Sequence, residues 1–193
     1  GWHGRHSGRC DVRGCPESSV TGSPNPKRRE ARTLALIALY ESDLAHHPVG
    51  EALGRLIAQN AQSEDAAGPD AGPIDDEADN ANLAPGPDAI AYASQLVSGV
   101  TVNRENIDAL LGVCAPEHPI SDLAAIDRNI LRIAVHELVA KLAPVKVIVN
   151  EAVELAKIYG SDASPRFIHG VLGAVTARIA YRGNPTTPTP ASP

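Results

Sequence analysis

The chain has 193 residues, of which 43% are hydrophobic, 3% are aromatic and 21% are charged, with a formal net charge of −6. This length suffices for one domain with a real core plus tails. Hydrophobic content that is mostly Ala, Leu, Ile and Val favours helices packed on helices. No apolar run reaches the roughly 18 residues of a membrane helix, and the first residues have no signal-peptide pattern. We therefore expect a cytoplasmic protein with no membrane contact.

Charge is distributed unevenly along the chain. Residues 1–32 contain seven Lys or Arg and three Asp or Glu, whereas residues 63–88 contain eight acidic residues and no Lys or Arg. A basic amino-terminal part on a mildly acidic protein predicts a local contact with a polyanion rather than a generally basic surface.

The cysteines are three in number, Cys10, Cys15 and Cys114. An odd count argues against a disulfide framework and indicates a reducing compartment. His3 and His6 precede the first two cysteines, but the spacing H-x2-H-x3-C-x4-C matches no common zinc-ligand pattern. We expect neither a metal site nor a cofactor.

Three segments are predicted to be disordered, because their composition cannot build a core. They are a basic tail over residues 1–26, an acidic insertion over residues 62–87 and a Pro/Thr-rich tail over residues 183–193. One helical domain is expected over residues 27–182. Its apolar periodicity predicts helices over residues 27–45, 50–60, 87–111, 121–142, 145–159 and 164–181. The fold class is therefore all-α, a bundle of about seven helices.

Local signals mark several helix boundaries. Ser121 and Asp122 are suited to cap the helix that follows them, and Gly160 is expected to end the helix before it. Ser164 as N-cap with Pro165 at the first helical position is expected to open the last helix.

The sequence has no motif of an enzyme, since it lacks G-x-S-x-G, a Gly-rich phosphate loop and HExxH. Glu151 and Glu154 lie one helical turn apart, as paired catalytic carboxylates would. Lys157 follows Glu154 at i+3, however, and we interpret the three as a solvated helix face. Arg132, one turn from Arg128, is expected to pair with nearby acids.

A cluster of basic residues begins the first predicted helix. The helix dipole disfavours cations at this end, so the cluster indicates that an anion is to bind there. Arg28 and Arg32 share a face and are suited to clamp a backbone phosphate. Tyr40 lies about 20° around the axis from Arg29 and could extend the strip by stacking. A merely solubilising helix start is the alternative. The cluster comprises Lys27, Arg28, Arg29 and Arg32.

A second cluster surrounds Phe167, which is the only phenylalanine of the chain. Arg166 and His169 flank it at the start of another helix, where free N–H groups favour anions. An aromatic ring beside cations suits single-stranded RNA, because a base stacks while phosphates bind the charge. Taken alone, one phenylalanine is better interpreted as part of the core.

Three stretches of the sequence carry a family resemblance: KRREARTLALIALYE, IDRNILRIAVHELV and PVKVIVNEAVELAKIYGSDASPRFIHGVLGAV. Together they resemble the bacterial NusB family of transcription antitermination factors, over about residues 27–182. The resemblance implies two packed helical subdomains and no catalysis. It also implies binding to boxA RNA of ribosomal RNA leader transcripts, within the RNA polymerase antitermination complex. The protein partner would be the small-subunit ribosomal protein that acts as NusE.

The resemblance also implies roles for individual residues. Asp127, at the start of the I-D-R helix, would lie near the protein partner. Phe167 should then be at least partly exposed, on the same side of the fold as the arginines of the first helix. The candidate RNA-binding residues are Lys27, Arg28, Arg29, Arg32, Tyr40, Arg166, Phe167 and His169.

The chain departs from the family pattern in four places. His169 replaces the usual Asn before G-V-L, which puts a contact through that amide in question. Ala163 stands where the family often has an acid, so repulsion of RNA should be reduced. Glu30 interrupts the arginine run, and the acidic insertion over residues 63–88 is long.

Two other functions agree with the same residues. The first is the RNA-binding module of an RNA cytosine methyltransferase, which would require a further catalytic domain after the last residue given. The second is a structural homodimer in which the arginine-rich surface is buried.

Overall fold

The computed structural model describes residues 25–65 and 85–183, and within them the chain forms seven α-helices and one 3-10 turn. The elements are α1 (Pro26–Ala45), α2 (Val49–Asp65), α3 (Pro87–Val102), α4 (Arg104–Cys114), η1 (Ile120–Asp122), α5 (Ala125–Ala140), α6 (Val145–Tyr159) and α7 (Ser164–Gly183). The all-α prediction is confirmed for this part of the chain. Among the same residues no helix combines the length and apolarity needed to cross a membrane.

Several of the sequence-based predictions lie outside the described residues. They concern residues 1–24, most of the acidic insertion and residues 184–193, together with the histidines and cysteines near the amino terminus. Cys114 is described and is a free cysteine.

Local capping fixes both ends of α1. The Asn25 side chain accepts a hydrogen bond from Lys27 N at 3.1 Å, and Pro26 occupies the first turn. The helix ends where His46 adopts the left-handed conformation with φ 55°. The end of α6 at Gly160 also agrees with the prediction.

Four predicted boundaries are corrected. The segment expected as one helix over residues 87–111 is two, because the Asn103 side chain donates to the Gly99 carbonyl at 2.9 Å and competes with the helical pattern. α5 begins at Ala125 rather than residue 121, since a 3-10 turn precedes it, and it ends where Lys141 becomes left-handed. α2 continues to Asp65, into the segment expected to be disordered.

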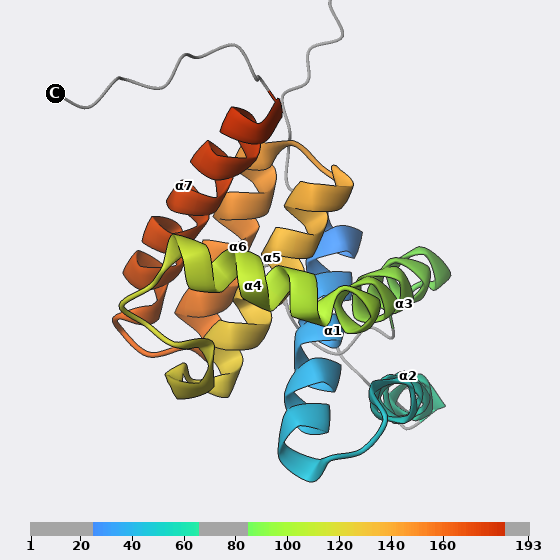
Figure 1. Cartoon of the computed structure of the whole chain (residues 1–193). Helices are drawn as coiled ribbons and strands as arrows, with labels where there is room; N and C mark the ends of the chain where they lie inside the picture. The colour runs from blue at the N-terminus through green and yellow to red at the C-terminus, as the bar shows by residue number, and fades with distance from the viewer. Residues whose placement is uncertain (1–24, 66–84, 184–193) are drawn as a thin grey trace, which may run out of the picture.

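α1 and α5 form the centre of the molecule. α1 packs against α2, α3 and α5, while α5 also packs against α6 and α7, so the α1–α5 contact joins two groups of helices (Figure 1). The two helices run antiparallel. Arg28 near the start of α1 donates to the Leu142 carbonyl just after α5, and Asp43 near the end of α1 meets Arg128 in the first turns of α5.

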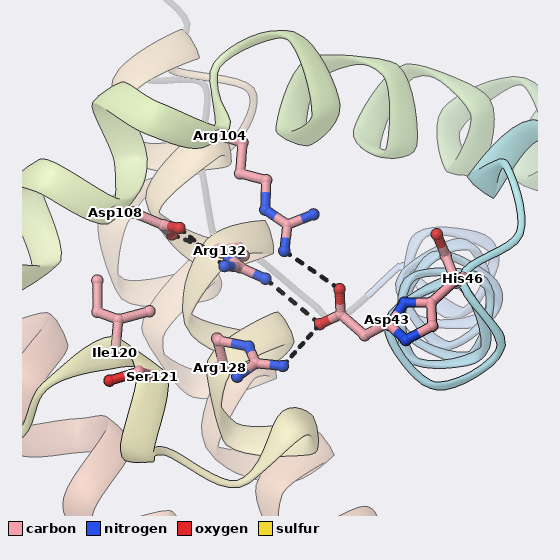
Figure 2. Close-up of a pocket in the computed structure, with 9 residues that line it drawn as sticks. Asp43, His46, Arg104, Asp108, Ile120, Ser121, Arg128 and Arg132 are labelled. Carbon is pink, nitrogen blue, oxygen red and sulfur yellow. Dashed lines mark hydrogen bonds and ion pairs between the residues drawn. The ribbon is translucent and has the colours of Figure 1, made fainter.

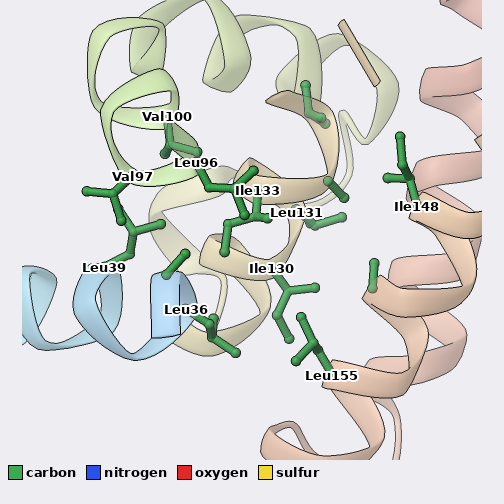
Figure 3. Close-up of a cluster of buried hydrophobic side chains, with 14 of the residues drawn as sticks. Leu36, Leu39, Leu96, Val97, Val100, Ile130, Leu131, Ile133, Ile148 and Leu155 are labelled. Carbon is green, nitrogen blue, oxygen red and sulfur yellow. The ribbon is translucent and has the colours of Figure 1, made fainter. Parts of the chain in front are cut away.

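The core lies where these helices meet (Figure 3). Burying a Leu, Ile or Val side chain stabilises the fold by about 1.5–3 kcal/mol. Leu44, near the end of α1, lies outside this core and is 59% exposed. The central side chains are Leu36 and Leu39 of α1, Leu96, Val97 and Val100 of α3, Ile130, Leu131 and Ile133 of α5, and Ile148 and Leu155 of α6.

Candidate nucleic-acid interface

The start of α1 presents cations at the surface. Lys27 is exposed and lies 3.0 Å from Asp88, a pair so exposed that it contributes at most about 1 kcal/mol. Arg28 is half-buried, donates to the Leu142 carbonyl at 2.8 Å and stacks 4.8 Å from the centre of the Tyr92 ring. No carboxylate pairs with Arg28 among the described residues, so its charge is available to an anion.

Arg32 is buried, which corrects the prediction that it contacts phosphate. Its side chain is 3% exposed, and its Nε and Nη2 donate to the two oxygens of Glu137 at 2.9 Å and 2.8 Å. Tyr92 donates to the same carboxylate. Because the charge of Arg32 is balanced inside the protein, it does not clamp a phosphate together with Arg28.

Two carboxylates behind this surface were not found from the sequence. Glu137 and Glu151 are 1% and 2% exposed. The prediction of a solvated face is wrong for Glu151, whereas Glu154 does bond Lys157 at 2.7 Å as expected. A signal existed for Glu137, because a carboxylate inside an apolar stripe requires a cationic partner.

The network behind this surface shifts the pKa values of Arg29, Arg32 and Tyr92. The hydrogen bond from Arg29 to Glu151 is the main reason that the pKa of Arg29 is raised. Burial, followed by the hydrogen bond to Glu137, raises the pKa of Tyr92. Tyr92 therefore remains a neutral donor, and Arg29 remains charged, throughout the physiological range.

The second predicted cluster lies at the start of α7. Phe167 is half-buried, which agrees with the expected partial exposure, and Arg166 and His169 are exposed. The exposed ring of His118 meets Phe167 edge to face, with centroids 5.1 Å apart. His118 was not singled out from the sequence, because it lies in the loop between α4 and α5, far from Phe167 along the chain.

The two clusters lie at opposite ends of α5, so Phe167 is well separated along the fold from the arginines whose side of the fold it was expected to share. Arg28 donates to the carbonyl of Leu142, which follows the end of α5. Ser164, at the start of α7, donates to Asp127 in the first turn of α5. The 16 residues of α5 span about 24 Å between these points. A ligand contacting both clusters must therefore be an extended chain.

Tyr40 lies between the two clusters along α1. It is half-buried and follows Arg29 by three turns, which places it about 16 Å towards the α7 end because α1 and α5 are antiparallel. The strip predicted from the sequence thus has the length needed to approach Phe167.

Asp127 connects α5 to α7. Its Oδ2 accepts from the Ser164 hydroxyl at 2.9 Å, and its Oδ1 is buried without a partner among the described residues. The corner is crowded, because a Cβ on Gly160 would lie 2.6 Å from that of Ser164. Asp127 therefore has a positioning role at the corner between α5 and α7.

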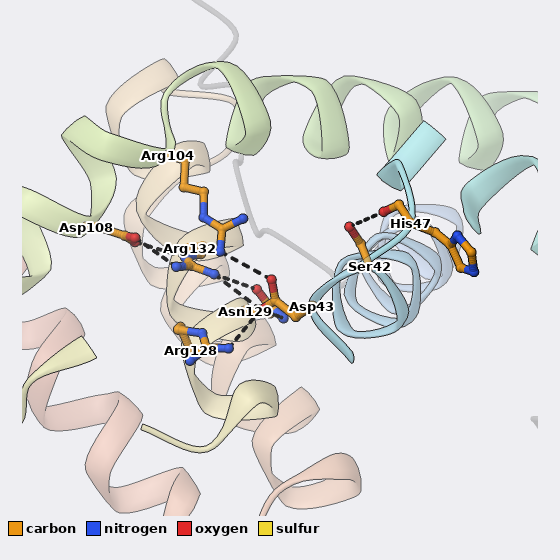
Figure 4. Close-up of polar contacts among 8 residues, drawn as sticks. All are labelled: Ser42, Asp43, His47, Arg104, Asp108, Arg128, Asn129 and Arg132. Atoms are coloured by element: carbon orange, nitrogen blue, oxygen red, sulfur yellow. Dashed lines mark hydrogen bonds and ion pairs between the residues drawn. The ribbon is translucent and has the colours of Figure 1, made fainter. Parts of the chain in front are cut away.

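A polar cleft of about 500 Å³ lies at the other end of α1 (Figure 2). Asp43 is its central anion, and Arg104, Arg128 and Asn129 donate to it (Figure 4). Arg132 donates to both oxygens of Asp108 at 2.9 Å and 2.8 Å.

The prediction that Arg132 pairs with nearby acids is confirmed, and Arg128 also pairs with Asp43. Burial alone would raise the pKa of Asp43, but hydrogen bonds from Arg128 and Asn129 and the nearby arginine charges lower it below its ordinary value. Since the arginines of the cleft already pair with the two acids, the cluster serves to join α1, α4 and α5.

The fold and the comparison with known protein families indicate the same class of protein. The chain forms an all-helical domain with a cationic helix start, and residues 29–177 match the family model described as the NusB family. The "Transcription antitermination protein NusB" of Dehalococcoides mccartyi (strain CBDB1) is 35% identical over 158 residues, covering 81% of this chain and 94% of the relative. That of Herpetosiphon aurantiacus is 38% identical over 152 residues, covering 77% and 88%. The chain therefore belongs to the NusB family.

Solved structures have the same fold. NusB from T. maritima aligns with a TM-score of 0.61 and 24% identity, covering 78% of this chain and 90% of that one. A crystal structure of antitermination factors NusB and NusE in complex with dsRNA contains a chain with a TM-score of 0.61 and 24% identity, covering 79% and 98%. At these identities the similarity shows the shared fold and no more.

Proposed function

We propose that this protein binds boxA-type single-stranded RNA of ribosomal RNA transcripts and supports antitermination by RNA polymerase. It acts with the small-subunit ribosomal protein that serves as NusE, in the cytoplasm and without catalysis. The observation that carries the proposal is the start of α1, where Arg28 has no carboxylate partner among the described residues and the Arg29 side chain is 45% exposed. Family membership agrees with it.

The roles of the candidate residues follow from their positions. Lys27, Arg28 and Arg29 neutralise phosphates, which makes binding salt-dependent. Tyr40 and Phe167 offer rings to unstacked bases along the path towards α7. Arg166 and His169 contact the RNA beside Phe167. Arg32 supports the surface from within.

The protein partner is proposed to bind near Asp127. Asp127 is half-buried, and its carboxylate is held in place by the Ser164 hydroxyl, which donates to Oδ2 at 2.9 Å, so a partner would meet a positioned acidic group. The heterodimer is expected to bind RNA more tightly than this chain alone and to read the boxA sequence.

A gel-shift titration tests the proposal. It uses boxA RNA, a scrambled RNA of equal length, and the unchanged protein with and without NusE. Tighter binding of boxA in the presence of NusE is expected, and the double variant R28A/R29A should lose most of it. Equal binding by this double variant would mean that the interface lies elsewhere. Light scattering with and without RNA tests the homodimer, in which the arginine surface would be covered until RNA is added.

A further inference from the structure

We propose that Glu151 is a positioning residue for RNA binding, which holds one edge of the Arg29 guanidinium while the remaining donors of Arg29 receive a phosphate. The inference rests on the proposed function and names the group that orients one of its phosphate-binding arginines. The contact between Arg29 and Glu151 therefore persists when RNA is bound.

The contact between the two side chains is bidentate. Arg29 donates from Nε at 3.1 Å and from Nη2 at 2.9 Å to the two oxygens of Glu151. The Glu151 side chain is 2% exposed and the Arg29 side chain is 45% exposed. Arg29 therefore covers a buried carboxylate with one edge. Of the five N–H donors of an arginine, the three others have no partner in the described part of the chain.

The buried charges behind Arg29 require its side chain to remain in contact with Glu151. Directly behind Arg29 lie two buried carboxylates, Glu137 and Glu151, and one buried cation in contact with them, Arg32, and all three side chains are at most 3% exposed. Arg32 directs its short bonds to Glu137 and lies 3.6 Å from Glu151. Without Arg29, Glu151 would keep only this longer contact.

Two energies decide whether a phosphate displaces Glu151 from Arg29 or binds Arg29 together with Glu151. A state in which a buried carboxylate has lost its cationic partner is disfavoured by a factor of roughly 100 or more. An exposed arginine–phosphate pair contributes about 5-fold or less, as exposed ion pairs do. A phosphate therefore cannot compete with Glu151 for the edge that Glu151 holds, and it binds the free donors instead.

Positioning favours binding because the side chain is ordered before RNA arrives. Fixing one flexible side chain at an interface reduces affinity by roughly 2- to 12-fold. For Arg29 this ordering happens on folding, since its guanidinium is already held by Glu151. The same contact sets the direction in which the free donors point.

The test compares E151Q with E154Q by RNA binding at one salt concentration. Both variants remove one negative charge from α6, but Glu154 bonds Lys157 and not Arg29. E154Q should bind RNA as tightly as the unchanged protein or slightly more tightly. E151Q should bind about 3- to 10-fold more weakly than E154Q in spite of its equal charge. Binding by E151Q equal to or tighter than that by E154Q overturns the inference.

A second measurement follows the Arg29 Nε–Hε signal by NMR, identified by its loss in R29K. This proton should exchange slowly with solvent both before and after RNA is added. Faster exchange on RNA binding overturns the inference. E151D retains the charge but shortens the side chain, and it should weaken RNA binding in the same way if E151Q does not fold. Failure of the unchanged protein to bind any RNA would overturn the proposed function and this inference together, whereas the E151Q outcome affects the inference alone.

Discussion

The two ends of α1 both gather arginines, and they arrange them in opposite ways. At its start the carboxylates are innermost, and the arginines cover them from outside. At its end a carboxylate, Asp43, is central, and arginines from α4 and α5 converge on it (Figure 4). The order of charges from inside to outside differs, although both ends combine arginines with carboxylates.

This order decides which end offers charge to a ligand. At the start of α1 the carboxylate of Glu151 is 2% exposed and its partner Arg29 is 45% exposed, so positive charge faces solvent. At the other end Asp43 is 10% exposed and already has several arginine partners. An arginine cluster thus becomes a binding surface only when its acids are beneath it.

The largest expected effect comes from removing the innermost acid at the start of α1. Glu137→Gln should lower the free energy of unfolding by about 3–5 kcal/mol, because it leaves Arg32 buried without its main partner. Urea unfolding measures the change. E154Q, at a partly exposed position, should stay within about 0.5 kcal/mol of the unchanged protein. Similar stability of both variants would mean that the buried pair contributes little.

Removing the central acid at the other end should have a somewhat smaller effect. Asp43→Asn should cost about 2–4 kcal/mol, since several arginines lose one charged acceptor that is less deeply buried than Glu137. Thermal and urea unfolding at neutral pH measure it, with the exposed Asp162→Asn as control.

The same variant gives a pH dependence. The folded pKa of Asp43 is lowered, so its contribution to stability is full above the ordinary value of 3.8 and is lost as the pH falls through the lowered pKa. The unchanged protein should therefore lose stability below about pH 4 more steeply than D43N. Parallel acid unfolding curves would contradict the assignment.

Phe167→Ala asks whether the binding surface extends from the start of α1 to the start of α7. The lost stacking should weaken RNA binding by about 1–3 kcal/mol. Fluorescence anisotropy with labelled RNA measures it, and circular dichroism confirms that the variant is folded, since Phe167 also packs against the core. Phe167→Trp, which retains a ring, should keep most of the affinity. Unchanged binding by F167A would confine the interface to α1.

Arg28→Ala should have the smallest effect, about 1 kcal/mol of RNA binding, with a salt slope reduced by about 0.7 for one lost phosphate contact. Arg104→Ala is the matched control, because Arg104 is 52% exposed but pairs with Asp43 at the other end. It should leave both the affinity and the slope unchanged. Equal effects of the two variants would indicate that RNA responds to overall charge rather than to the start of α1.

Much of the fold was predicted from local signals. α1 and α6 match their predicted ranges to within one residue, because Asn25, Pro26, Pro144 and Gly160 act within one turn of the helix ends. The single helix expected over residues 87–111 was wrong, since apolar periodicity continues across the break at Asn103. Periodicity reports which face is buried and is insensitive to a short interruption.

The candidate site was predicted less completely. Sequence patterns identified the cations at the start of α1, whereas the partial exposure of Phe167 was implied only by the family resemblance. They did not identify Glu137 or Glu151, whose partners lie 105 and 122 residues away along the chain. For Glu151 a nearby lysine in the sequence suggested a solvated face, but Lys157 bonds Glu154 instead.

The sequence by itself determined the helices, the family and the presence of basic residues at the start of α1, because these depend on spacing and on contacts within a few residues. Only the tertiary structure decided which arginines remain available. Arg29 and Arg32 lie three residues apart on one helix, yet the packing of α5 against α1, and of α6 against α5, buries one and leaves the other at the surface. That outcome depends on which acids the neighbouring helices bring, and spacing along a single helix carries no information about them.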